Sequence, residues 1–181
     1  AEPMILMAYI LPLLVAGLHF AIHLPIVHFL TKYMQSIEIV RILALGYYFQ
    51  AIASPALSIS LAMNKQTKLI LIAAPMVGLN FLLNYLFIVS GWGIKGVAIG
   101  TSITYFFSFC SVIFFAHLFM GEARKSFFKT LLVILIPFLY TVLLFYVIDI
   151  YIQFPPEPLG QDILATILKI GLFAVLYSLV F

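Results

Sequence analysis

The sequence predicts an all-α integral membrane protein with six transmembrane helices. Of its 181 residues, 65% are apolar and only 8% are charged, whereas a soluble domain carries about 25% charged residues because its surface faces water. The apolar residues form six continuous runs, and each run is long enough for a helix to cross a bilayer core of about 30 Å. We therefore expect lipid to surround most of the chain.

The six expected spans are separated by short connections that contain turn residues and charges. Their bounds are Met4–Leu30, Ile39–Met63, Leu69–Ser90, Gly96–Met120, Phe128–Ile152 and Ile163–Phe181. Each run is continuously apolar, whereas a strand of a membrane barrel alternates apolar and polar residues. The pattern therefore favours helices over barrel strands.

Basic residues near the ends of the spans predict the orientation of the chain. The connections after the second and fourth spans are flanked by Lys65, Lys68, Arg124, Lys125 and Lys129. The opposite side has fewer basic residues, namely Lys32, Arg41 and Lys95. Because cytoplasmic connections carry an excess of Lys and Arg, we expect the first set in the cytoplasm, together with both ends of the chain.

Several function classes are disfavoured by the residues present. The chain has no Walker-type phosphate loop, no HExxH zinc signature and no GxSxG elbow, so we expect no enzyme, catalytic residue, metal or cofactor. Cys110 is the only cysteine, which rules out a disulfide within the chain and a cysteine-based metal site. The net charge of +3 is spread along the sequence and predicts no nucleic-acid partner.

Two of the expected spans carry a polar face. Gln50, Ser54 and Ser58 recur every four residues in the second span, near Tyr47, and Asn80 and Asn84 do so in the third. Polar side chains in hydrocarbon need partners, so these faces are expected to point at other helices or at a watery cavity. Both interpretations stay open: interhelical hydrogen bonds that hold the bundle together, and a cavity in which Gln50, Asn80 and Asn84 face a substrate.

The fourth span opens with a ladder of small residues. Gly96, Gly100, Thr104 and Ser108 recur every four positions. Such a ladder lets another helix backbone approach closely. We interpret it as a packing face.

Prolines are frequent in the spans and are expected to bend them, because each removes a backbone hydrogen bond. These positions, with one glycine, are Pro12, Gly17, Pro25, Pro55, Pro75 and Pro137. Helices broken near the midplane are typical of transporters, although prolines also occur in ordinary membrane helices.

Four histidines lie in apolar surroundings. His19 and His23 are one turn apart in the first span. We expect neutral, hydrogen-bonded histidines and not a metal pair or a proton relay, because no third ligand has a matching spacing. His28 and His117 lie near the ends of their spans. We expect these two at the membrane interface.

Three further charges fall inside or near the spans. Arg41 lies one turn after Glu38, which predicts a local ion pair, and Asp149 lies near the end of the fifth span. Lys169 lies about 10 Å into the sixth expected span at 1.5 Å per residue, and snorkelling to the interface would account for it. The alternative is that Lys169 or Arg41 lines a path for an anionic head group.

Two stretches of the sequence resemble a known family. One runs through Leu61-Ala62-Met63-Asn64-Lys65 to Asn80-Phe81-Leu82-Leu83-Asn84-Tyr85, and the other is Gly93-Ile94-Lys95-Gly96-Val97-Ala98-Ile99-Gly100-Thr101, with Tyr105 one turn later. Together they are similar to the C-terminal part of polysaccharide biosynthesis proteins, the O-antigen and exopolysaccharide flippases. These belong to the multidrug/oligosaccharidyl-lipid/polysaccharide exporter superfamily. The match is best from Ile39 to Tyr105.

The resemblance implies a transporter of about 12 to 14 helices in two inverted bundles, of which this chain is the C-terminal portion. Residues 1–120 would supply four helices of the second bundle, and residues 121–181 two additional ones. The chain starts at Ala1-Glu2-Pro3 and stops within the apolar run Leu172–Phe181, which also led us to expect a piece of a longer protein. The missing N-terminal half would then be its partner.

The leading hypothesis is an exporter of lipid-linked oligosaccharide in the bacterial inner membrane, which works by alternating access and is coupled to an ion such as H⁺ or Na⁺. A multidrug and toxin extrusion antiporter of the same superfamily is the alternative. It would need a carboxylate deep in a helix, and the first four spans contain none in their interiors. A membrane enzyme or an interaction protein ranks third, because the loop before the last span offers only Glu157 and Asp162.

Overall fold

The computed structural model is entirely helical over residues 2–119, 121, 124–152 and 159–181, the part of the chain that it describes, apart from short turns. The elements are α1 (Glu2–Ala21), α2 (His23–Phe29), the short 3₁₀ helix η1 (Thr31–Tyr33), α3 (Ser36–Ala62), α4 (Gln66–Val89), α5 (Gly93–Phe119), α6 (Arg124–Tyr151) and α7 (Leu159–Ser178).

Among the described residues, six helical segments are long and apolar enough to cross a membrane, as the sequence predicts for a multi-pass helical membrane protein. The first of them, Pro3–Phe29, combines α1 and α2. Several helices begin three or four residues earlier than predicted, because the polar residues of their first turns were assigned to the connections. Thus α3 begins at Ser36 and α7 begins at Leu159. The expected bound at Met120 and the loop acid Glu157 lie outside the described residues.

Two turns explain where α3 and α4 end. Asn64 after α3 and Gly91 after α4 have positive φ angles of 55° and 83°, the left-handed conformation that ends many helices. Lys65 N donates to Ser60 O at 3.0 Å, and Trp92 N donates to Phe87 O at 3.0 Å, so both ends satisfy their last carbonyls in the same way. The Asn64 and Gly91 turns that the sequence indicated therefore reverse the chain tightly.

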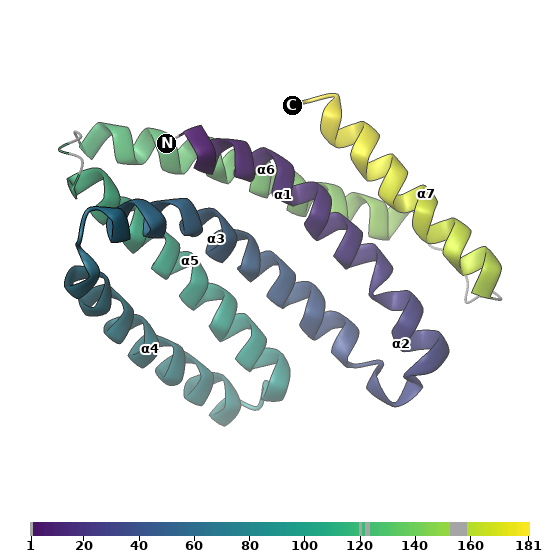
Figure 1. Ribbon diagram of the computed structural model, residues 1–181. Coiled ribbons are helices and arrows are strands. Elements are labelled where there is room, and N and C mark those ends of the chain that lie inside the picture. Colours follow the sequence, from purple (N-terminus) through teal and green to yellow (C-terminus); the bar gives the residue numbers. More distant parts are fainter. Residues whose placement is uncertain (1, 120, 122–123, 153–158) are drawn as a thin grey trace.

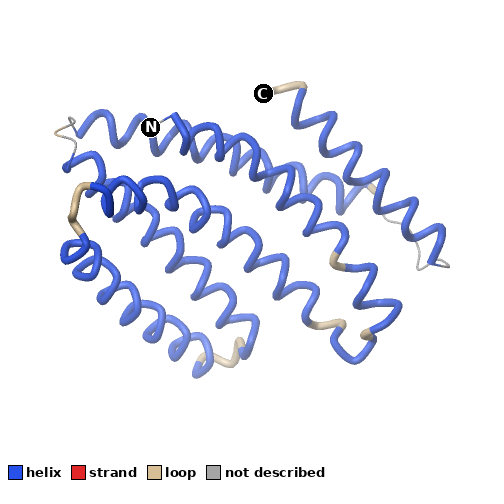
Figure 2. Tube along the Cα trace, viewed as in Figure 1, coloured by secondary structure: helices blue, strands red, loops and turns tan. Residues whose placement is uncertain are grey.

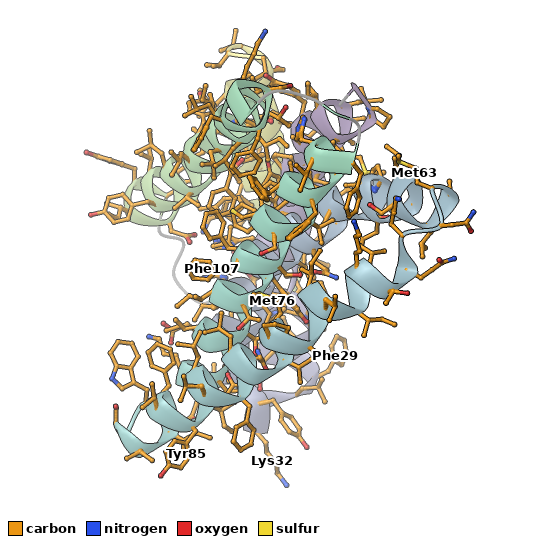
Figure 3. All side chains as sticks on the ribbon, turned by 90° about the vertical axis from the view of Figure 1, so that its left-hand side faces the viewer. Phe29, Lys32, Met63, Met76, Tyr85 and Phe107 are labelled. Carbon is orange, nitrogen blue, oxygen red and sulfur yellow. The ribbon has the colours of Figure 1, made fainter. Side chains whose placement is uncertain are left out.

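The helices form one elongated bundle whose turns gather at its two ends (Figures 1 and 2). Helix α3 packs against α1 and α5, α4 packs mainly against α5, and the α6–α7 hairpin packs against α1. Helix α4 therefore forms one edge of the bundle and α7 the other (Figure 1). Lys32 and Tyr85 lie at one end of the bundle, away from Met63 (Figure 3). The turns before α3 and between α4 and α5, the end of α6 and the start of α7 share that end, which we call the α2–α3 end.

Two apolar clusters hold the bundle together. One joins α1, α3, α5 and α6 around Phe49, Phe109, Ile113 and Ile134. The other joins α1, α6 and α7 around Phe20, Phe145 and Phe173. Helix α6 contributes to both, whereas Ile72 is the single buried residue of α4. The division of the chain at residue 120 that the resemblance implies stays a prediction.

Candidate functional site

Asp149 is the hub of a charged cluster near the α2–α3 end, where four helices meet. His19 Nε2 of α1 lies 3.0 Å from Asp149 Oδ2, Arg41 Nη1 of α3 lies 3.8 Å from the same oxygen, and Lys169 Nζ of α7 lies 3.9 Å from Oδ1. The carboxylate is one-third exposed and the His19 side chain is 9% exposed. Because a charge taken out of water needs compensating partners, this cluster ties α1, α3 and α7 to α6.

His19 is held in place on both sides of its ring. The ring stacks on Phe145 at a centroid distance of 4.0 Å, and Phe20 contacts it edge-on. Its Nε2 makes the hydrogen bond to Asp149. His19 is therefore hydrogen-bonded, as expected, and its partner is a carboxylate 130 positions later in the chain.

Arg41 bridges the backbone of α1 and the Asp149 hub. Its Nε donates to His19 O at 3.1 Å, in addition to the contact between Nη1 and Asp149. The predicted local ion pair with Glu38 was wrong, because Glu38 is 61% exposed and pairs with Lys95 at the start of α5. Glu38 and Arg41 lie one helical turn apart, but their side chains pair with different residues.

A second carboxylate, Asp162, lies in the first turn of α7 and binds two histidines of α2. His28 Nε2 lies 2.8 Å and His23 Nδ1 lies 3.5 Å from Asp162 Oδ2. Asp162 is 9% exposed, and the partial positive charge of a helix N-terminus favours an anion at this position. The sequence placed Asp162 in a loop, which was wrong because α7 begins four residues earlier than predicted. The expected position of His28 at the membrane interface stays a prediction.

The first span is interrupted where these clusters form. Pro25 has no N–H with which to donate to the carbonyl of Ala21, so the regular ladder of hydrogen bonds cannot pass this point. Accordingly α1 ends at Ala21 and α2 begins at His23. The break lets His19 face α6 while His23 and His28 face α7. Pro12, Pro55, Pro75 and Pro137, in contrast, lie inside helices that remain continuous.

A small polar cavity of about 90 Å³ lies beside Asp162, Arg41 and Lys169. Its lining comes from α1, α2, α3 and α7, and consists of Phe20, His23, Arg41, Asp162, Ala165, Thr166 and Lys169. Arg41 also borders a wider hollow of about 780 Å³ at the α2–α3 end, next to Trp92 and Lys95. Arg41 therefore lines both the wider hollow and the small cavity, and Lys169 is the second cation in the lining of the small cavity.

Of the residues predicted for a cavity, Arg41 and Lys169 lie together at this cluster. Lys169 lies ten residues after the start of α7, about 15 Å at 1.5 Å per residue, farther into the helix than expected. Its ammonium group has an intramembrane carboxylate, Asp149, within 3.9 Å. Snorkelling is therefore not needed to account for its position.

Asn80 and Asn84 lie elsewhere, between α4 and α5. Asn80 Nδ2 donates to Thr101 Oγ1 at 3.3 Å and to Thr104 Oγ1 at 3.4 Å, and Asn84 Nδ2 donates to Asn80 Oδ1 at 3.0 Å. Both side chains are half-buried. Their geometry is that of an interhelical hydrogen-bond network.

The small residues of α5 face this network. Gly96 and Gly100 are buried against α4, and a Cβ at Gly100 would lie 2.7 Å from Asn84 Oδ1. Thr104 is also buried and donates to the carbonyl of Gly100 at 2.9 Å, while Ser108 is half-buried. The absence of side chains at the two glycines lets α4 approach closely.

The polar face of α3 does not join the charged cluster. Gln50 is half-buried, whereas Ser54 and Ser58 are exposed, and Ser58 Oγ donates to Ser54 O of its own helix at 3.1 Å. Tyr47 is exposed and its ring centroid lies 5.2 Å from that of Tyr105. A serine hydroxyl that is satisfied by its own helix needs no polar partner on another helix.

Sequence reasoning missed five members of the site, namely His19, His23, His28, Asp149 and Asp162. One signal could have found them. Consecutive spans cross the membrane in opposite directions, so one end of the bundle contains the end of the first span, the start of the second, the end of the fifth and the start of the sixth. All these residues fall there. His117 is 2% exposed and lies edge-on to Phe127, and its expected depth at the membrane interface stays a prediction.

Comparisons of the chain with protein-family models, with curated proteins and with solved structures found no match. The function is therefore argued from the residues of the site.

Proposed function

We propose that this chain is the C-terminal portion of a membrane transporter that exports lipid-linked oligosaccharide across the bacterial inner membrane for cell-surface polysaccharide synthesis. The observation that carries the proposal is the cavity between α1, α2, α3 and α7, which has Arg41 and Lys169 in its lining. Charged residues within membrane spans are costly and mark substrate or ion pathways. A lipid-linked sugar carries its negative charge on phosphate, which Arg binds well.

The interrupted first span adds support. Broken helices that border polar sites are typical of transporters, because the backbone groups freed at the break can bind substrate or ions together with nearby side chains. The break after Ala21 lies directly beside the charged cluster. The resemblance of residues 39–105 to the flippase family, given above on its motifs, points to the same function.

In the proposed mechanism Arg41 and Lys169 attract the phosphate of the lipid carrier from the hollow at the α2–α3 end. Asp149 holds both cations in place at 3.8 and 3.9 Å in the absence of substrate. The missing N-terminal half would supply the other wall, and rocking of two bundles would change the side to which the path opens. The cycle involves no covalent chemistry and draws on a gradient of H⁺ or Na⁺.

The test is a translocation assay with the full-length protein in proteoliposomes that contain a fluorescent lipid-linked oligosaccharide. We expect Arg41→Gln and Lys169→Gln each to lower the translocation rate at least tenfold, which corresponds to losing about 1.4 kcal/mol of interaction with the phosphate. The matched control is Lys68→Gln, which removes an exposed cation in the first turn of α4, outside the lining of the cavity and the hollow, and should leave the rate within twofold.

The second candidate is the cation antiporter of the same superfamily, and the two intramembrane carboxylates favour it. Asp149 and Asp162 could bind a cation, but Asp149 is already surrounded by Arg41, Lys169 and His19, which repel one. Proteoliposomes that expel a cationic dye, and do not move the lipid-linked sugar, would establish the antiporter and overturn the flippase.

A further inference from the structure

Asp162 joins the broken first span to the last helix. It is the first-turn carboxylate of α7, and its Oδ2 faces both His28 Nε2 at 2.8 Å and His23 Nδ1 at 3.5 Å. The two histidines lie on α2, 134 and 139 positions away in sequence. We infer that Asp162, His23 and His28 form a proton-binding clasp that fastens α7 to α2.

The chemistry of the three groups makes the clasp depend on protons. Histidine is the side chain that changes its charge between pH 5 and 8. When the imidazoles carry a proton, they face the buried Asp162 carboxylate as cations, and charge-assisted hydrogen bonds are about twice as strong as neutral ones. When they are neutral, the carboxylate stays buried with only neutral donors, and its desolvation then favours release of the first turn of α7 into water.

The charged groups that face the clasp come from every helix around it. Arg41 of α3 and Lys169 of α7 line the cavity that Asp162 and His23 also line, and Asp149 of α6 with His19 of α1 lies behind them. Arg41 and Lys169 are already within 4 Å of Asp149. The histidines of α2 are therefore the groups whose charge sets the pairing of Asp162.

The clasp also forms part of the cavity wall. Below it, α7 is held by the apolar cluster of Phe20, Phe145 and Phe173, which does not respond to pH. Release of the clasp would move the first turn of α7 away from α2 while this cluster stays closed. Since Asp162 and His23 both line the cavity, proton binding would close its α2–α7 side and proton loss would open it.

The experiment measures the distance between spin labels on α7 and η1 in the full-length protein in nanodiscs. In a Cys110→Ser background, labels are attached to Lys32→Cys and Gly160→Cys, both at exposed positions, and nothing lies within 4 Å of a Cβ at Gly160. We expect one narrow distance distribution at pH 5.5 and a second, longer population at pH 8.5.

Asp162→Asn should remove the pH dependence, and His28→Gln should reduce it at least twofold. Glu38→Gln is the matched control, because it breaks an exposed ion pair with Lys95 away from α7 and should keep the wild-type response. His28→Gln changes no buried charge at high pH, so it provides the test if Asp162→Asn does not fold. Identical distributions at both pH values, opening at low pH, or a full response in the folded Asp162→Asn or His28→Gln variant would overturn the clasp. The readout needs no substrate, so it stands apart from the transport proposal.

Discussion

The α4–α5 hairpin and the charged cluster near the α2–α3 end differ in how their polar side chains are paired. Both place polar side chains among apolar helices. The hairpin uses neutral amides, threonines and glycines, and its hydrogen-bonded residues lie at most 24 positions apart in the sequence. The cluster uses ionisable groups, and its histidines and carboxylates lie 130 and 134 positions apart. The hairpin holds two neighbouring helices at close range, and the cluster collects five helices around two carboxylates and a cavity. The neutral network therefore packs two helices together, and the charged one is where we propose that a ligand or a proton binds.

The largest effect is expected from removing the hub of the cluster. Asp149→Asn leaves Arg41 and Lys169 without their carboxylate, and breaking such a pair costs about 3–5 kcal/mol when it is fully buried. Because Asp149 is one-third exposed, we expect the free energy of unfolding in mixed micelles to fall by about 2 kcal/mol.

A double variant sharpens this prediction. Lys169→Met in the Asp149→Asn background removes one of the cations that contact Asp149 in the wild type and should restore part of the lost stability, measured as a coupling energy in a double-mutant cycle. Additive effects of the two substitutions would show that the 3.9 Å contact between Lys169 and Asp149 contributes nothing.

An intermediate effect is expected at the closest approach of the hairpin. At Gly96 an added Cβ would lie 2.6 Å from Phe87 Cβ and 2.7 Å from Trp92 Cβ, so Gly96→Ala must push α4 and α5 apart. Overpacking of this kind costs about 1–3 kcal/mol, which the same unfolding titration measures.

Gly78→Ala on α4 is the matched control, because nothing lies within 4 Å of its added Cβ. It should be neutral or slightly stabilising, since alanine is the better helix former. Equal effects of Gly78→Ala and Gly96→Ala would contradict the packing function of the ladder.

The smallest effect is expected from the neutral hydrogen bonds. Asn80→Ala removes the bonds to Thr101 and Thr104, and hydrogen bonds between membrane helices average about 0.6 kcal/mol each. We therefore expect a loss of about 1 kcal/mol, checked by the same titration. Ser58→Ala, which removes a bond to its own helix, should change the stability less than Asn80→Ala does. A loss at Asn80 as large as that at Asp149 would remove the distinction between the two regions.

The contact between α4 and α5 could be predicted from the sequence, because the residues that meet there are close along the chain. Repeats of Asn80 and Asn84 and of Gly96 and Gly100 flank a turn with Gly91 and Gly93, so a tight reversal brings the two faces together. Local repeats thus indicate which faces of neighbouring helices meet. They do not show whether such a face also borders a cavity, which is why Gln50, Asn80 and Asn84 stood as cavity candidates.

The sequence by itself determined the six membrane spans, since a chain with 65% apolar and 8% charged residues can hide its surface only in lipid. It also supplied the charges and the proline that interrupts the first span. Only the tertiary structure decided which charges meet. Arg41 contacts Asp149 and not Glu38, and Asp162 contacts two histidines of α2, because α6 and α7 pack against the first span. Such pairings depend on helix packing over more than a hundred residues, and no local pattern encodes them.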